Sequence, residues 1–313
     1  MFFDIECASV HKNCAKICAF GYVVCDEEFN ILEKEDILIN PRGRFELTDR
    51  KGEKGIVLPY EYDEFKKQPP FTHVYKRIKK LLENPENRVF GHAVLNDVKY
   101  LNLETKRFKL PSFRFRFGDS QLMYMSLKND FSRQFGLEYI ANDLGVEFTP
   151  HRAADDAYAT MRIVEALCKN LGCGVDGLYE KLGFTEGKIE NYSVSRPQST
   201  GFKRYKTDKN EAKAARSRAR VKFYDNLSRK RYKKGGKLGG KTFTFCRALE
   251  DNVDISVALV DKIYELGGRY SQHVDECKIF VKTEGDDSDR TKKAVKAEKT
   301  VITVEGLTEL LND

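Results

Sequence analysis

The chain has 313 residues and a net charge of +7, with 41% hydrophobic and 33% charged residues. This composition is typical of a soluble globular protein and excludes an intrinsically disordered chain. At roughly 150 residues per domain, the length favours about two domains. The longest apolar run, residues 17–25, is far shorter than the roughly 20 residues that span a bilayer, so we expect no membrane segment.

The N-terminal residues and the cysteines indicate a cytoplasmic protein. The opening letters MFFDIEC reach two carboxylates almost at once, whereas a secretory signal needs a basic start and a longer apolar stretch. The eight cysteines lack the spacings of a zinc site. We therefore expect reduced, structural thiols.

The first half of the chain, residues 1–170, reads as an α/β domain. Three early strands, the first two of them apolar, are followed by alternating strands and helices, which indicates a mixed sheet flanked by helices. That layout is compatible with a ribonuclease-H-like fold. The expected strands are residues 2–6, 16–25, 31–40, 88–91 and 113–117, and the expected helices are residues 71–82, 96–103, 137–144 and 153–167.

Residues 171–240 read as a basic linker. Residues 196–241 hold 17 Lys and Arg against 3 Asp and Glu, a net charge of +14 that leaves −7 for the rest of the chain. Residues 209–232 are predicted to be helical, and the glycine-rich run 235–240 is predicted to be a flexible joint. Such a basic block indicates a polyanionic partner, although a solvated linker helix would have the same charge.

Residues 241–313 are predicted to form a small second α/β domain. Strands are expected over residues 242–246, 278–282 and 300–304, with a helix after each of them. The first of these helices should stop at Gly267 and Gly268, a pair typical of a helix C-terminus.

Asp4 and Glu6 are the first candidate metal ligands. Residues two apart on a strand share a face, so both carboxylates should project from the same side of the first strand. Two neighbouring carboxylates repel each other unless a divalent cation binds them. An exposed acidic strand is the alternative, but the flanking Phe2, Phe3 and Ile5 favour a buried one.

Two later segments supply further candidates. Asp97 lies at the start of a predicted helix, where an Asp would also serve as a helix cap. His151 precedes another predicted helix and Asp156 lies in its first turns. A histidine on a loop beside a carboxylate fixed on a helix suits a general base next to a metal ligand.

Taken together, these segments resemble the DEDDh exonucleases, the family of the proofreading subunit of bacterial DNA polymerase III. The matching stretches are FFDIE, GHAVLND and GLEYIANDLGV followed by HRAADDAYAT. The resemblance implies that Asp4, Glu6, Asp97 and Asp156 hold two divalent metal ions, Mg²⁺ or Mn²⁺. It also implies that His151 takes the proton of the attacking water. Cys7, Ala93 and Asn96 differ from the residues usual in the family at these positions. These differences affect the expected contacts to the nucleotide and the rate more than the chemistry.

The C-terminal residues 241–313 resemble a BRCT domain. The resemblance rests on the strand at residues 242–246, on Gly267 and Gly268, on a helix over residues 288–297 and on the final VITVEGLTELL. It implies binding to DNA ends or to a replication or repair protein. A generic small α/β domain is the alternative.

The sequence thus predicts a metal-dependent 3′–5′ exonuclease that releases nucleoside 5′-monophosphates from DNA. An exoribonuclease of the same family and a non-catalytic nucleic-acid-binding scaffold are the alternatives. The complete set of four carboxylates and one histidine favours an enzyme over a scaffold.

Overall fold

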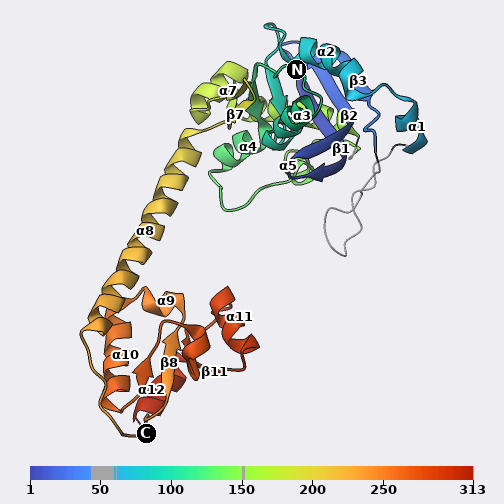
Figure 1. Ribbon diagram of the computed structural model, residues 1–313. Coiled ribbons are helices and arrows are strands. Elements are labelled where there is room, and N and C mark those ends of the chain that lie inside the picture. The colour runs from blue at the N-terminus through green and yellow to red at the C-terminus, as the bar shows by residue number, and fades with distance from the viewer. Residues whose placement is uncertain (44–59, 61, 150–151, 313) are drawn as a thin grey trace. The chain divides into compact units, whose positions relative to one another are not determined.

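The computed structural model describes residues 1–43, 60, 62–149 and 152–312. The chain forms two compact units, Met1–Lys206 and Thr207–Asp313 (Figure 1). All eight cysteines are free thiols. Among the described helices, none combines the length and the apolar character needed to cross a bilayer.

The first unit is built on a seven-stranded mixed sheet with the order β3-β2-β1-β4-β5-β6-β7. Strand β2 is antiparallel to both of its neighbours β1 and β3, and β4 and β5 run parallel to β1. Strand β6 is antiparallel to β5, and β7 is antiparallel to β6. The bounds are β1 Phe2–His11, β2 Cys14–Cys25, β3 Ile31–Leu38, β4 Val89–Gly91, β5 Phe115–Asp119, β6 Gly187–Glu190 and β7 Ser193–Ser195.

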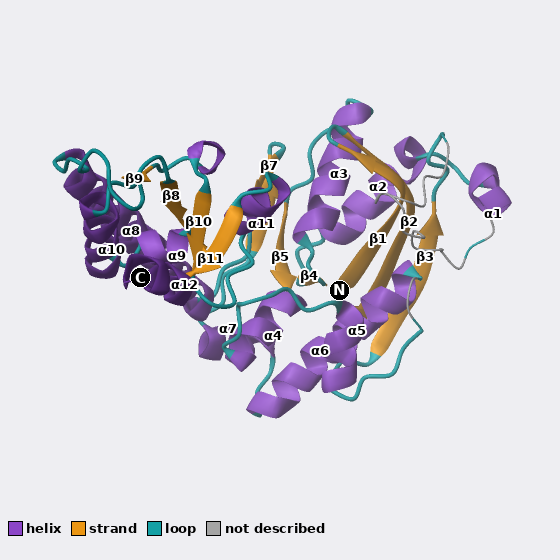
Figure 2. Cartoon of the chain, turned by 90° about the horizontal axis from the view of Figure 1, so that it is seen from below, coloured by secondary structure: helices purple, strands orange, loops and turns teal. Residues whose placement is uncertain are grey.

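Helices cover both faces of this sheet (Figure 2). Buried residues of α2 and α3 join one core with Phe3 and Phe20, and those of α4, α5 and α6 join another with Phe2 and Val23. Alternate residues of β1 therefore enter opposite cores, as the pleat of a strand requires. The bounds are α1 Tyr62–Lys67, α2 Phe71–Leu82, α3 Leu95–Arg107, α4 Ser120–Lys128, α5 Leu137–Asp143, α6 Ala153–Leu171 and α7 Val175–Leu182.

The predicted ribonuclease-H-like mixed sheet flanked by helices is confirmed. Strand β1 is longer than predicted because it continues past register shifts between Glu6 and Ser9, which an alternation pattern does not reveal. The prediction missed α1, α4, α7, β6 and β7. The last three lie in the expected linker, and β6 and β7 complete the first sheet, so the first unit extends to Lys206.

The second unit contains a four-stranded parallel sheet with the order β11-β10-β8-β9. Helix α8, Thr200–Ser228, begins in the first unit and ends in the second, where Phe223 is fully buried. The other bounds are β8 Thr242–Phe245, α9 Arg247–Glu250, α10 Val253–Glu265, β9 Arg269–Tyr270, β10 Ile279–Lys282, α11 Asp289–Lys296, β11 Thr300–Thr303 and α12 Val304–Asn312.

The glycine-rich run 235–240 is part of the second unit, so the prediction of a flexible joint was wrong. Leu238 is fully buried, and its backbone N–H donates to the carbonyl of Leu266 at 2.8 Å. Gly267 adopts φ +86°, and a Cβ there would lie 1.9 Å from the carbonyl oxygen of Gly235. The glycines therefore allow two backbone segments to touch, which composition alone does not distinguish from flexibility.

Because of this contact, we expect two glycine substitutions to lower the free energy of unfolding by different amounts. Gly267→Ala should lower the free energy of unfolding by ~3 kcal/mol, because it combines backbone strain with a steric overlap. Gly285→Ala is the matched control, since Gly285 also has a positive φ, +71°, but faces open space. It should cost ~1 kcal/mol. Equal costs in chemical denaturation of the two variants would contradict the proposed backbone contact.

Candidate metal centre and active site

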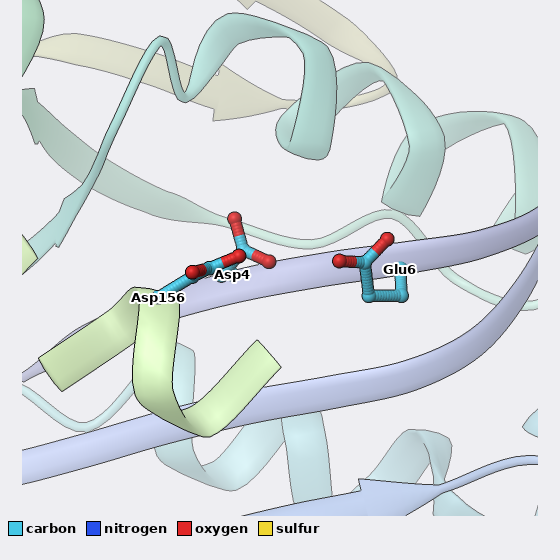
Figure 3. A group of neighbouring side chains, drawn as sticks. All are labelled: Asp4, Glu6 and Asp156. Atoms are coloured by element: carbon cyan, nitrogen blue, oxygen red, sulfur yellow. The ribbon is translucent and has the colours of Figure 1, made fainter. Parts of the chain in front are cut away.

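Strand β1 presents Asp4 and Glu6 on one face of the sheet, as the spacing predicts. Phe3 and Ile5 alternate with them and are buried on the opposite face. Figure 3 shows the carboxylates of Asp4 and Glu6 beside that of Asp156, which reaches them from α6. One oxygen from each of the three residues lies within 4.8 Å of the others. Such a separation is compatible with shared coordination of a cation.

Helix α6 reaches Asp4 because a glycine lies beneath its first turn. Asp4 pairs with Gly21 on β2, and Gly21 pairs with Asp36 on β3, so the three residues form a row across the sheet. A Cβ at Gly21 would lie 2.0 Å from the carbonyl carbon of Ala153 and from the nitrogen of Ala154. Any larger residue would push the helix away from the sheet.

Two side chains hold the N-terminus of α6 in this position. The backbone N–H of Ala154 donates to Asp36 at 2.7 Å, and that of Ala153 donates to the Tyr60 hydroxyl at 3.1 Å. Both N–H groups belong to the first turn, where no carbonyl of the helix can accept them. The sequence analysis missed both residues. For Asp36 no local signal exists, because the backbone group that it caps is 118 residues away in the chain.

Asp97 lies close enough for its charge to raise the pKa of Asp4, but it is not part of the group formed by Asp4, Glu6 and Asp156. It is 7% exposed, in the first turn of α3. Burial, followed by the negative charges of Glu6 and Asp119, raises its pKa well above the usual range. The alternative that Asp97 caps α3 is wrong, because Val94 is the N-cap residue and no side chain caps this helix.

Asp119 and His92 support the loop that leads into α3. Asp119 caps α4, and its Oδ1 also accepts from Ala93 N at 3.1 Å. Burial raises the pKa of Asp119 to about 6. His92 lies 3.0 Å from Ser120 Oγ and 3.2 Å from the carbonyl of Phe135, and burial lowers its pKa to about 4. His92 is therefore a neutral structural residue at pH 7.

The electrostatics of the cluster favour a bound cation. Burial raises the pKa of Asp4 well above its usual range, and the charges of Asp97, Glu6, Asp156 and Asp36 add to the same effect. Burial and the nearby Asp156 and Asp36 raise the pKa of Glu6 to about 8. Converging carboxylates in a buried place are costly unless they are protonated or bind a cation. Donors that are all oxygen atoms fit Mg²⁺ or Mn²⁺.

The predicted general base, His151, lies outside the described residues together with Pro150. Its role stays a prediction. Asp155, which precedes the candidate ligand Asp156, pairs with Lys34 at 2.6 Å.

Comparison with known proteins identifies the family. The model of the exonuclease family RNase_T matches residues 1–164. No curated protein sequence matches the chain. The fold and the family match define the class, and the chain belongs to this exonuclease family.

Solved structures with a similar fold include three nucleases, all at low sequence identity. A 3′-exonuclease solved with a histone mRNA stem-loop has a TM-score of 0.48 and 15% identity, with 63% of this chain and 68% of that chain covered. The nuclease domain of 3'hExo, described as a DEDDh family member and bound to rAMP, has a TM-score of 0.45 and 18% identity, with 55% of this chain and 90% of that chain covered. E. coli exonuclease I with a dT13 oligonucleotide has a TM-score of 0.43 and 19% identity over 58% and 42%.

The contact between Gly21 and α6 predicts that nuclease activity requires glycine at position 21, although glycine has no side chain to take part in the reaction. Gly21→Ala should lower the nuclease rate by ~100-fold, the scale of loss that a shift of about 1 Å produces at an active site. Gly174→Ala is the control, because a Cβ there meets no atom within 4 Å. Circular dichroism would establish that both variants are folded. A Gly21→Ala variant with the full rate would contradict the role of this contact.

The raised pKa of Glu6 predicts how pH affects the metal-free protein. A carboxyl whose pKa rises from 4.5 in the unfolded chain to about 8 in the folded protein stabilises the fold below pH 4.5. That stabilisation is lost as the pH rises towards 8. Glu6→Gln should therefore raise the melting temperature in EDTA at pH 8.5 by ~5 °C, and by less at pH 5.

The exposed Glu28 provides the control, because Glu28→Gln should change the melting temperature little at either pH. Added Mg²⁺ should stabilise the wild type more than Glu6→Gln, since only the wild type keeps the complete carboxylate cluster. A Glu6→Gln variant that melts below the wild type in EDTA at pH 8.5 would contradict the electrostatic argument.

Proposed function

We propose that this protein is a metal-dependent 3′–5′ exonuclease that releases nucleoside 5′-monophosphates from DNA 3′ ends. The observation that carries the proposal is the convergence of Asp4, Glu6 and Asp156, with Asp97 close by, in a member of an exonuclease family. Two buried carboxylates, Asp97 and Asp156, beside the partly buried Asp4 and Glu6 destabilise the fold unless a cation offsets their charge, because each of them is at least partly desolvated.

In this proposal Asp4, Glu6, Asp97 and Asp156 would hold two divalent cations, with Glu6 and Asp156 serving the first, Asp97 the second and Asp4 both. The cations, when bound, neutralise the phosphate charge and stabilise the attacking and the leaving oxygens. Asp36 and Tyr60 hold the helix that carries Asp156. His151 accepts the proton of the attacking water and so raises the nucleophilicity of its oxygen.

DNA is the favoured substrate and RNA is the alternative. A protein distinguishes the two through contacts to the 2′-hydroxyl, and no such contact is identified among the described residues. The resemblance to proofreading exonucleases favours a role in DNA replication or repair, and the free cysteines favour the cytoplasm.

The second unit is proposed to be a BRCT-like domain that binds DNA ends or a replication or repair protein. Its parallel sheet and its helices α10, α11 and α12 support this proposal, because they occupy the positions on which the resemblance rests. The basic residues of α8 favour a nucleic acid as a partner of this part of the chain.

The test is nucleotide release from 5′-labelled single-stranded DNA and from RNA of the same sequence, with Mg²⁺, Mn²⁺ or EDTA. The wild type should give a ladder that shortens from the 3′ end, and only with metal. Asp4→Asn should abolish release, and His151→Ala should slow it by ~100-fold or more, the usual contribution of a general base.

Asp155→Asn is the matched control, because Asp155 neighbours a proposed ligand but pairs with Lys34. It should keep the wild-type rate within about threefold, since a partly exposed ion pair contributes little stability. A ladder from RNA alone would favour the exoribonuclease. No release from either substrate with either metal would refute the enzymatic proposal and leave a nucleic-acid-binding scaffold.

A further inference from the structure

Four of the nine basic residues of α8 form a stripe along one side of the helix. Lys209, Lys213, Arg216 and Arg220 follow one another at intervals of four, three and four residues. At about 100° per residue, the four side chains fall within an arc of roughly 60°. The acidic residues of this helix, Asp208, Glu211 and Asp225, are turned away from the stripe by roughly 80° or more.

The stripe is open to solvent along most of its length. Residues 207–218 are all exposed, and Phe223 is the buried residue of α8. At its C-terminal end the stripe is fixed to the second unit, because Arg220 pairs with Asp251 at 3.0 Å. The helix therefore presents the cations at fixed intervals, and its backbone has little conformational entropy left to lose on binding.

Charge repulsion along the stripe indicates a polyanionic partner. Cations three or four residues apart on a helix are neighbours, and each like-charged pair destabilises the helix by roughly 0.2–0.5 kcal/mol. Lys209 with Lys213 and Lys213 with Arg216 are two such pairs, and Arg220 continues the row with its charge partly offset by Asp251. A row of negative charges beside the stripe would offset the repulsion between its cations and would itself be attracted to them.

The composition around the stripe favours phosphates over a protein surface. Residues 207–220 contain no aliphatic side chain larger than alanine and no aromatic one. A protein interface needs an apolar core, and stacking of bases needs aromatic side chains, so neither is available here. Contacts between cations and phosphates remain, and these do not depend on base sequence.

We propose that the basic stripe, Lys209, Lys213, Arg216 and Arg220, binds the phosphate backbone of a nucleic-acid strand. The choice of a nucleic acid as the polyanion rests on the proposed function. The stripe contributes affinity without sequence preference, and this affinity falls as the salt concentration rises, because bound counterions are released.

The test compares two triple variants of the same helix in the full chain. The stripe variant is Lys209→Gln, Lys213→Gln and Arg216→Gln. The control variant is Arg204→Gln, Arg218→Gln and Lys222→Gln, which removes the same charge from exposed residues of α8 away from the stripe. Both carry Asp4→Asn, so that the labelled single-stranded DNA of mixed sequence stays intact during anisotropy measurements.

The stripe variant should bind at least about 10-fold more weakly than the Asp4→Asn parent. The slope of log affinity against log salt should become shallower by about 2, which is roughly 0.7 for each of three lost phosphate contacts on a single strand. The control variant should lose less than half as much in both quantities. Equal losses in the two variants, or no loss in either, would overturn the proposal.

A separate measurement distinguishes failure of this inference from failure of the proposed function. Hydrolysis of bis(p-nitrophenyl) phosphate by the wild type reports on the carboxylate site, because this small diester carries no extended backbone. Hydrolysis together with equal affinity losses in the two variants would refute the stripe alone. Weak binding by the stripe variant without any metal-dependent hydrolysis would support the stripe and refute the exonuclease.

Discussion

The carboxylate cluster depends on direct contact between the backbone of α6 and the sheet at Gly21. A Cβ at this position would lie 2.0 Å from the backbone of α6, so the helix and Asp156 with it would have to move away from Asp4 and Glu6. Asp4, Gly21 and Asp36 lie in a row across three strands. Asp4 belongs to the carboxylate cluster, Gly21 leaves space for α6, and Asp36 caps the first turn of α6. Asp36 also adds negative charge to the cluster, which raises the pKa of both Asp4 and Glu6. The same residue therefore positions the site and increases its need for a cation.

The sequence was sufficient to predict the features that repeat at short range. Alternation along β1 placed Asp4 and Glu6 on one face, and helical spacing gave the bounds of α2 as the structure has them. The close approach of Asp156 to β1 was implied by the family resemblance, because no local pattern connects residues 4 and 156. The roles of Gly21, Asp36 and Tyr60 escaped prediction for the same reason. Each of them contacts the backbone of α6, and a backbone contact leaves no complementary residue in the sequence to recognise.

The errors in the second half of the chain have a different physical origin. Glycine is common both in flexible linkers and where two backbones touch, and the run 235–240 belongs to the second kind. Strands β6 and β7 are four and three residues long, too short for a period-2 pattern to stand out from the loops around them. The family match ends at residue 164, whereas the first sheet continues to β7, so the sheet extends beyond the segment that defines the family.

The carboxylate cluster and the basic stripe carry opposite charges, and each suits a different part of a nucleic-acid substrate. The carboxylate cluster repels a phosphodiester, so binding of the scissile phosphate at that place requires cations to invert the local charge. Such cations act over a few ångströms and contribute little to holding the rest of a polymer. The basic stripe on α8 has the complementary property, because it attracts a phosphate backbone without any group able to assist hydrolysis. Within the net charge of +7, residues 196–241 carry +14 and the rest of the chain carries −7, so this segment is basic within an otherwise acidic chain. Raising the salt concentration should therefore weaken substrate capture more than it slows hydrolysis of substrate already bound.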